Sequence, residues 1–119
     1  MQYTKLGSSD LKVSRICMGC MGFGDASNGQ HTWTVDEEHS RQIIKRGLEL
    51  GVNFFDTAIA YQSGTSEIFL GNALWDYAQR DKVVVATKFL PRTQAEIDEG
   101  ITGQQHIERM INKNLEIVN

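Results

Sequence analysis

Three side chains in this sequence have the types and the spacing that proton-transfer chemistry requires. Asp56 directly follows the apolar run NFF, Tyr61 comes five residues later, and Lys88 ends the run VVVATK. An ionised Asp is costly inside a strand unless a cation pairs with it, so we expect Asp56 at a strand end, beside Lys88. A neighbouring ammonium lowers the pKa of a phenol, which would make Tyr61 a proton donor near neutral pH.

This chemistry depends on where the side chains lie on their strands. In parallel β/α folds the reacting groups collect at the carboxyl ends of the strands, so Asp56 and Lys88 should be neighbours on one rim of a sheet. Alternation along a strand sends Phe54 and Asp56 to one face, and Ala86 and Lys88 to one face of their own strand. If the two faces coincide, the charged pair forms in a partly dry pocket that Tyr61 can reach from the following loop.

Hydrophobic periodicity places these residues in alternating strands and helices. The expected elements are a hairpin of two extended runs over 2–6 and 11–15, strands over 16–20, 52–57 and 82–89, and helices over 36–50, 66–78 and from 102 to the end. Units of about 30 residues that alternate in this way predict a parallel sheet with right-handed crossovers. No Gly-rich linker or charge run divides residues 1–119, so we expect a single unit without an internal boundary.

Capping motifs and apolar spacing define the predicted helices. A T-x-x-E motif from Thr34 to Glu37 predicts a capping box at the start of the first helix, and Gly51 is expected just past its end. Thr102 and Gln105 predict a second capping box. Helical spacing places five residues on one face of the second helix, namely Phe69, Leu70, Ala73, Leu74 and Tyr77. The third helix is marked by Ile107, Met110, Ile111, Asn114, Leu115 and Val118.

Composition and charge argue against several classes of partner. The net charge is −3 and no window gathers Lys and Arg into a stripe, so we expect no nucleic acid and no anionic lipid. No secretory signal and no apolar run of roughly 18 residues is present, which predicts a cytoplasmic protein without a membrane partner. Cys17 and Cys20 form a CxxC, but on a strand their Cα atoms would lie about 10 Å apart, so we expect neither a disulfide nor a metal unless a turn starts at Gly19.

The segment GFGDASNGQHTW, residues 22–33, predicts a long loop without periodicity. Loops of this length in compact domains tend to be functional or disordered. Within it, His31 is a candidate contact in a substrate pocket, although a simple loop residue is the plainer interpretation. Trp33 either walls such a pocket or packs onto the fold, and His39 is expected on a helix surface.

The order of these motifs is similar to that of the aldo-keto reductases. The segments that carry the resemblance are LGSSDLKVSRICMGCMGFG, NFFDTAIAY, GTSEIFLGNAL and VVVATK, and the similarity extends over essentially all 119 residues. The loop sequence GDASNGQHTWTVDEEHS resembles bacterial members with an extended first loop. The resemblance implies an oxidoreductase that uses NADPH to reduce small-molecule aldehydes or ketones, on a (β/α)8 TIM barrel whose cofactor lies extended across the barrel mouth.

The resemblance also implies roles for individual residues. Tyr61 would donate the proton to the carbonyl oxygen, Lys88 would lower the pKa of that phenol, and Asp56 would pair with Lys88. The hydride would come from the nicotinamide. The expected cofactor contacts, near the nicotinamide and its ribose, are Gly19, Cys20, Met21 and Asp56.

Two departures from the family pattern limit this expectation. The family's fourth catalytic group is a His at the end of the fourth strand, and the sequence stops before that strand; His106 lies inside the third predicted helix and cannot replace it. The late strands and loops that hold the pyrophosphate and the 2′-phosphate are also absent. Because a barrel needs about 250 residues, we expect an α/β partial barrel, with the hairpin and about three β/α units, that belongs to a longer enzyme and has little or no activity alone.

Two alternatives remain open at this point. The same fold serves as a cytoplasmic subunit of ion channels, so a non-catalytic binding or regulatory module is one of them. The other is a short protein that completes its barrel by self-association. An inner sheet face with Phe54, Val84 and Ala86 open to water, together with two unpaired sheet edges, would favour such an assembly.

Overall fold

The N-terminal segment forms the predicted hairpin. In this computed structural model, which describes residues 1–118, β1 (Tyr3–Lys5) pairs antiparallel with β2 (Lys12–Ser14). The side chain of Asn53 joins the hairpin to the rest of the fold, because its Oδ1 accepts a hydrogen bond from the backbone N–H of Ser14 at 2.7 Å.

The second sheet has three parallel strands in the order β3-β4-β5, namely β3 (Met18–Gly19), β4 (Phe54–Asp56) and β5 (Val84–Ala86). Chain-adjacent strands are therefore neighbours in the sheet, as the alternating pattern predicted. Backbone pairing between β4 and β5 continues past the assigned strand ends, since the N–H of Ile59 donates to the carbonyl of Lys88 at 3.0 Å. The segments that follow β4 and β5 therefore reach the same rim of the sheet.

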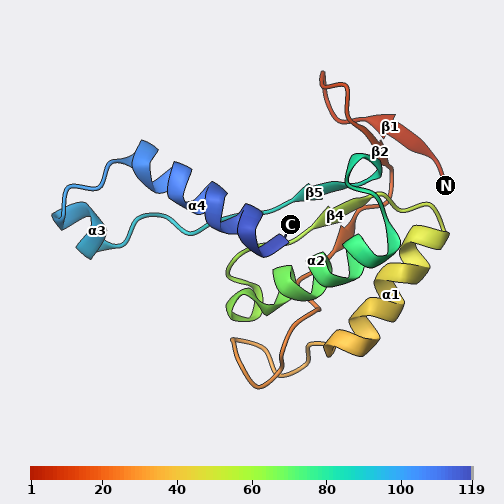
Figure 1. Cartoon of the computed structure of the whole chain (residues 1–119), viewed down its shortest axis with the longest axis horizontal. Helices are drawn as coiled ribbons and strands as arrows, with labels where there is room; N and C mark the ends of the chain where they lie inside the picture. The colour runs from red at the N-terminus through yellow and green to blue at the C-terminus, as the bar shows by residue number, and fades with distance from the viewer. Residues whose placement is uncertain (119) are drawn as a thin grey trace.

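Two helices, α1 (Glu37–Glu49) and α2 (Thr65–Tyr77), lie together on one side of the parallel sheet (Figure 1). Their inner faces and the covered face of the sheet form one hydrophobic core. Its buried members are Cys20, Phe23, Ile44, Val52, Phe55, Leu70, Ala73, Leu74 and Val83. Complete burial of a side chain such as Phe55 contributes about 1.5–3 kcal/mol, so this core holds the rim in place.

The cap of α1 differs from the predicted capping box. Asp36 is the N-cap, and its Oδ1 accepts a hydrogen bond from the N–H of His39 at 2.9 Å. Thr34 lies before the helix because the next residue, Val35, is held in extended pairing: its N–H donates to the carbonyl of Gly22 at 2.8 Å. A tertiary contact therefore delays the helix start to a residue that is an equally good cap.

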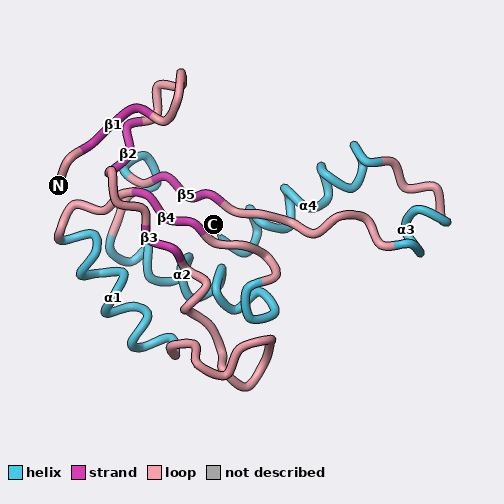
Figure 2. The backbone as a smooth tube through the Cα atoms, turned by 180° about the vertical axis from the view of Figure 1, so that it is seen from behind, coloured by secondary structure: helices cyan, strands magenta, loops and turns pink. Residues whose placement is uncertain are grey.

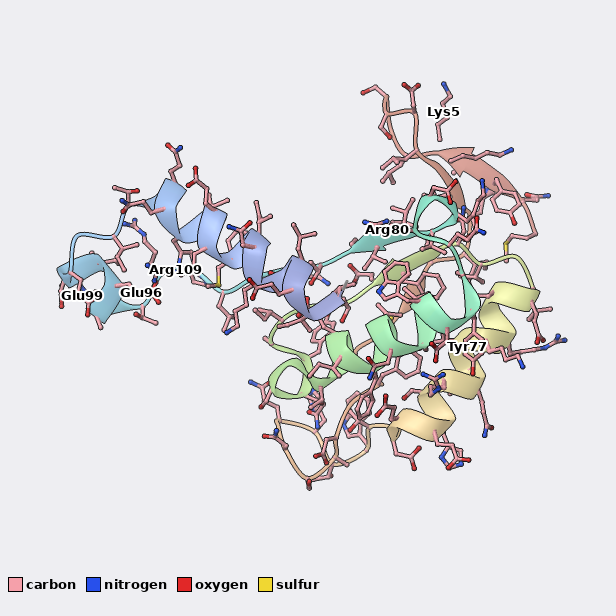
Figure 3. The ribbon with its side chains drawn as sticks, in the orientation of Figure 1. Lys5, Tyr77, Arg80, Glu96, Glu99 and Arg109 are labelled. Atoms are coloured by element: carbon pink, nitrogen blue, oxygen red, sulfur yellow. The ribbon has the colours of Figure 1, made fainter. Side chains whose placement is uncertain are left out.

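The buried face of α2 also differs in part from the prediction. Leu70, Ala73 and Leu74 are buried as expected, but Tyr77 is exposed on the side of α1, where the cations of Arg41 and Lys45 lie 5.3 and 5.4 Å from its ring centroid. Figure 3 labels Tyr77 in this position. The buried face instead extends to polar residues of the first turn, Ser66 and Glu67.

After β5 the chain forms an arm, residues 89–118, that runs out from the sheet and returns (Figures 1 and 2). It contains α3 (Gln94–Asp98) and α4 (Gly103–Val118). α3 was not predicted. The capping box of α4 is confirmed, because Thr102 and Gln105 exchange hydrogen bonds of 2.9 and 3.1 Å. The radius of gyration is 15.5 Å, against about 13.5 Å for a compact domain of this length.

The residues whose spacing marked α4 in the sequence are buried only in part. Asn114 and Val118 are buried, whereas Ile107, Ile111 and Leu115 are exposed. The buried row runs along the neighbouring line of residues four apart, namely His106, Met110, Asn114 and Val118, of which Met110 is half-buried. Asn114 in this row has polar partners in α2 and directly after β5, namely Glu67 and Thr87.

The inner face of the parallel sheet is half-buried rather than open to water. Phe54, Val84 and Ala86 all have intermediate exposure. Among residues 1–118, β3 and β5 each have a single strand neighbour, so one edge of each is free of strand pairing. No helix in that range is long and apolar enough to cross a membrane.

Candidate active site

Asp56 and Lys88 meet at the carboxyl ends of β4 and β5. The Nζ of Lys88 lies 2.8 and 3.0 Å from the two carboxylate oxygens of Asp56, and it donates to the carbonyl of Thr57 at 2.7 Å. Three acceptors thus fix the ammonium in one place. Both side chains are partly exposed, and solvent screening makes such a pair a weak contributor to stability. The ion pair matters because it holds the positive charge of Lys88 at the strand end.

Tyr61 lies next to this pair, at the start of the turn Tyr61–Gly64 that follows β4. The Nζ of Lys88 is 5.0 Å from the centroid of the Tyr61 ring, so the ammonium has a carboxylate on one side and a phenol on the other. Burial alone lowers the pKa of Lys88, but its interactions with Asp56 and Tyr61 outweigh this and raise the pKa above its usual value. Lys88 is therefore a permanent cation at neutral pH.

Residues 19–21, at the end of β3 and just after it, alternate between the rim of the sheet and the core. Gly19 is in register with Asp56, and a Cβ built on Gly19 would meet nothing within 4 Å. Met21 is exposed, whereas Cys20 points to the opposite face and is fully buried in the core. Burial raises the pKa of the Cys20 thiol to about 12. Gly19 therefore offers open surface beside Asp56, and Met21, two residues further on, is also exposed. The side chain of Cys20 lies in the core, and its backbone N–H and carbonyl bond to other parts of the chain.

The two cysteines do not form a disulfide in the described chain. Cys17 is exposed and Cys20 is buried, and both thiols are free. The two cysteines flank β3 and are three residues apart, so alternation along an extended chain turns their side chains to opposite faces. The expectation against a disulfide rests on the same alternation.

Two polar residues in the first turn of α2 hold the strand ends, and sequence reasoning missed both. The hydroxyl of Ser66 donates to the carbonyl of Cys20 at 2.7 Å and lies 3.1 Å from the hydroxyl of Thr57. The Oε1 of Glu67 accepts from the hydroxyl of Thr87 at 2.5 Å. Each strand end is thus fastened next to a candidate site residue. The sequence signal for both was a pair of polar residues, Ser66 and Glu67, next to the apolar face of a predicted helix.

Glu67 also joins α4 to the site. Its Oε1 accepts a second hydrogen bond, from the side-chain amide of Asn114, and that amide lies 3.2 Å from the hydroxyl of Thr87. Glu67 is completely buried. Its Oε1 is paired, but its Oε2 has no hydrogen-bond partner among residues 1–118, so the cost of burying the carboxylate is compensated only in part. The hydrogen bonds of Oε1 join α2, the end of β5 and α4.

His31 and His106 lie in the long loop and in the arm. His31 is in the long loop, and its ring stacks on that of Trp33 at 4.6 Å between centroids. His106 is buried in the arm, where Nε2 lies 2.7 Å from the carbonyl of Leu90 and Nδ1 lies 3.0 Å from Oε2 of Glu96. Figure 3 labels Glu96 at the far end of that arm.

Comparison with known proteins identifies relatives of this site and fold. The model of the aldo/keto reductase family matches residues 15–119. The versiconal hemiacetal acetate reductase of Aspergillus parasiticus is 42% identical over 89 residues, which cover 74% of this chain and 25% of that protein. The aldo-keto reductase YhdN of Bacillus subtilis is 36% identical over 88 residues, with coverages of 74% and 25%.

A solved structure shows the same arrangement of elements. The holo form of the aldo-keto reductase AKR11C1 from Bacillus halodurans matches 99% of this chain and 36% of its own, with a TM-score of 0.75 and 32% sequence identity. Such relatives are (β/α)8 barrels, and this chain has the N-terminal hairpin and the first strands and helices of one. The chain spans about a quarter of the length of the curated relatives it matches. From the family match over residues 15–119 and these likenesses, this chain belongs to the aldo/keto reductase family.

Proposed function

We propose that this protein is an oxidoreductase that reduces an aldehyde or a ketone to the alcohol with NADPH, and that Tyr61 is its proton donor. The observation that carries the proposal is the position of the Lys88 ammonium at the carboxyl ends of two parallel strands. It is hydrogen-bonded to both carboxylate oxygens of Asp56 and lies 5.0 Å from the centroid of the Tyr61 ring. Family membership supports the reaction class.

The proposed roles follow from the charges at the rim. Reduction of a carbonyl adds a hydride to carbon and a proton to oxygen; bound NADPH supplies the hydride. The Tyr61 hydroxyl gives its proton to the carbonyl oxygen, and the adjacent Lys88 cation stabilises the phenolate that remains. Asp56 keeps the ammonium at the strand end, so that its charge faces the phenol.

The residues beside Asp56 fit the nicotinamide end of such a cofactor. A flat ring and its ribose need an unobstructed surface, and the open space over Gly19 provides one. The exposed side chain of Met21 adds apolar area next to it. Preference for NADPH over NADH depends on contacts to the 2′-phosphate, and for that choice the proposal rests on family resemblance alone.

The experiment is a turnover assay on the full-length natural protein, with an aromatic aldehyde such as benzaldehyde and either NADPH or NADH. Tyr61→Phe removes the proton donor and keeps the ring, so we expect kcat/KM to fall by about 10²–10⁴-fold, the usual contribution of general acid catalysis. NADPH binding, followed by fluorescence, should be unchanged. The 119-residue chain alone is expected to show little or no turnover.

A matched control is Tyr77→Phe, which removes a hydroxyl from an exposed tyrosine on α2. Its turnover should equal that of the wild type. Wild-type rates in Tyr61→Phe would remove the proton-donor assignment. Failure of the wild-type protein to reduce any aldehyde or ketone with either cofactor would remove the proposed reaction.

A further inference from the structure

The turn that carries Tyr61 contains two residues in an unusual backbone conformation. Gln62 has φ 47° and Ser63 has φ 53°, both in the left-handed region. For residues other than glycine this conformation costs on the order of 1–2 kcal/mol each, so surrounding contacts must compensate. Ser63 is exposed, but Gln62 is only 2% exposed. The buried side chain of Gln62 is therefore where compensating contacts should be found.

The amide of Gln62 is hydrogen-bonded to three positions of the first loop, residues 24–34. Its Nε2 donates to the carbonyls of Asp25 and His31 at 2.8 and 2.7 Å, and lies 3.3 Å from the hydroxyl of Thr34. Its Oε1 accepts from the N–H of His31 at 2.8 Å. Both donors and the acceptor of the amide are thus used. The side chain replaces the regular backbone pairing that this loop lacks.

Two glycines of the first loop allow its backbone to lie close to Gln62. A Cβ on Gly24 would lie 2.5 Å from Cβ of Gln62, and a Cβ on Gly29 would lie 2.7 Å from its Cα. Both glycines also have positive φ, 143° and 150°. The loop is therefore closed tightly around one side chain, and the glycines are there because a larger residue would collide with Gln62.

The first loop connects the rim to α1 and carries an aromatic pair. It follows the segment after β3 and lies beside the turn Tyr61–Gly64, where the orange and green parts of the chain meet in Figure 1. His31, whose N–H and carbonyl are both bound by Gln62, stacks on Trp33. Trp33 as a whole is 57% exposed. An ordered, exposed aromatic surface is thus held next to the turn of the proposed proton donor.

We propose that Gln62 is a positioning residue: it holds the first loop against the Tyr61 turn, so that the His31–Trp33 pair forms a wall for a planar, aromatic carbonyl substrate. The substrate part of this inference rests on the proposed function. The loop part stands on the hydrogen bonds and close contacts alone. Tyr61 is held separately, since its N–H donates to the carbonyl of Ala58 at 3.1 Å, so loss of the Gln62 side chain should loosen the loop without displacing the phenol.

The first test measures the loop directly, by hydrogen–deuterium exchange with mass spectrometry on the full-length natural protein and its Gln62→Gly variant. Glycine accepts the left-handed backbone and removes the side chain, so the turn itself is preserved. Exchange in peptides that cover residues 24–34 should become about tenfold faster or more, because His31 loses its partner in the folded state. The matched control is Ser63→Gly, which relieves the same backbone strain at an exposed side chain and should leave loop exchange unchanged.

The second test uses steady-state kinetics on the same variants with benzaldehyde and NADPH. For Gln62→Gly we expect KM for the aldehyde to rise about tenfold, with kcat and the Kd for NADPH within about twofold of the wild type. A small aliphatic aldehyde, which gains little from an aromatic wall, should show a smaller increase in KM. Ser63→Gly should behave as the wild type with both substrates.

Each part of the inference has its own contradicting result. Unchanged loop exchange in Gln62→Gly would overturn the positioning role. Faster loop exchange with an unchanged KM for both aldehydes would overturn the aromatic wall. Absence of any reductase activity in the wild type would remove the proposed function, whereas the exchange result for Gln62 would be unaffected by it.

Discussion

The body of the molecule, residues 1–88, and the arm, residues 89–118, have similar apolar side chains but bury them to different extents. In the body, Ile44, Phe55, Leu70 and Leu74 are fully buried. In the arm, six large apolar residues are 41–60% exposed, namely Phe89, Leu90, Ile97, Ile107, Ile111 and Leu115, whereas Val118 is buried. An amphipathic pattern is thus enough to form a helix such as α4, but a second element must cover its apolar face before burial stabilises it.

The arm is attached to the body chiefly by hydrogen bonds at one end of α4. Asn114 reaches Glu67, and the indole of Trp75 donates to the carbonyl of Val118. Close backbone approach adds to this, since a Cβ on Gly71 would lie 2.8 Å from that carbonyl oxygen. The body is therefore held by apolar burial and the arm by a few polar contacts, which predicts different responses to substitution.

The largest effect is expected for Phe55→Ala in the centre of the body. Removal of a fully buried phenylalanine leaves a cavity and should lower the free energy of unfolding by about 3–5 kcal/mol. Urea denaturation followed by circular dichroism measures this value. A loss below about 1 kcal/mol would contradict the view that apolar burial holds the body.

A smaller effect, localised to the junction, is expected for Glu67→Ala. The hydroxyl of Thr87 and the amide of Asn114 would lose a buried acceptor, which costs about 1–3 kcal/mol. Hydrogen–deuterium exchange should increase in α4 and at the end of β5, and remain unchanged in α1. Glu108→Ala is the control, because Glu108 is exposed and bonds only to Gln104 on its own helix. Equal loosening of α1 and α4 would mean that Glu67 stabilises the whole fold and not the junction.

The smallest effect is expected for Ile111→Ala on the exposed face of α4. An exposed site of this kind changes the free energy of unfolding by less than about 0.5 kcal/mol, whereas Leu70→Ala in the body should cost about 2–5 kcal/mol. Thermal and urea denaturation of both variants give the comparison. A loss in Ile111→Ala as large as that in Leu70→Ala would show that something covers this face in solution, and the concentration dependence of the melting temperature would test a second copy of the chain in that role.

Features set by neighbouring residues could be predicted from the sequence. The hairpin and the capping box of Thr102 and Gln105 depend on contacts within a few positions. α3 could also have been found, because Thr93 and Glu96 have the same T-x-x-E spacing and the N–H of Glu96 donates to Thr93 at 3.2 Å. The Asp56–Lys88 contact spans 32 residues, but a single rule of parallel sheets brings the carboxyl ends of adjacent strands together.

Features set by packing between distant segments could not be predicted. Tyr77 and Ile111 fit the apolar faces of their helices, yet both are exposed in the described part of the chain. Tyr77 lies beside two cations of α1 rather than in the core. Asp36 replaced Thr34 as the cap of α1 because Val35 pairs with Gly22. In each case the local pattern allows two outcomes of similar free energy, and a tertiary contact selects one.

The sequence by itself determined the alternating strands and helices and the three side chains that meet at the rim, because periodicity and strand order act along the chain. Only the tertiary structure decided that Gln62 and Glu67 are buried and that each joins distant segments. A polar side chain is normally exposed, and partners from other elements offset the cost of its burial. They satisfy the whole amide of Gln62 but only one of the two carboxylate oxygens of Glu67. Those partners are separated from it by 31 residues for Gln62 and His31, and by 47 for Glu67 and Asn114.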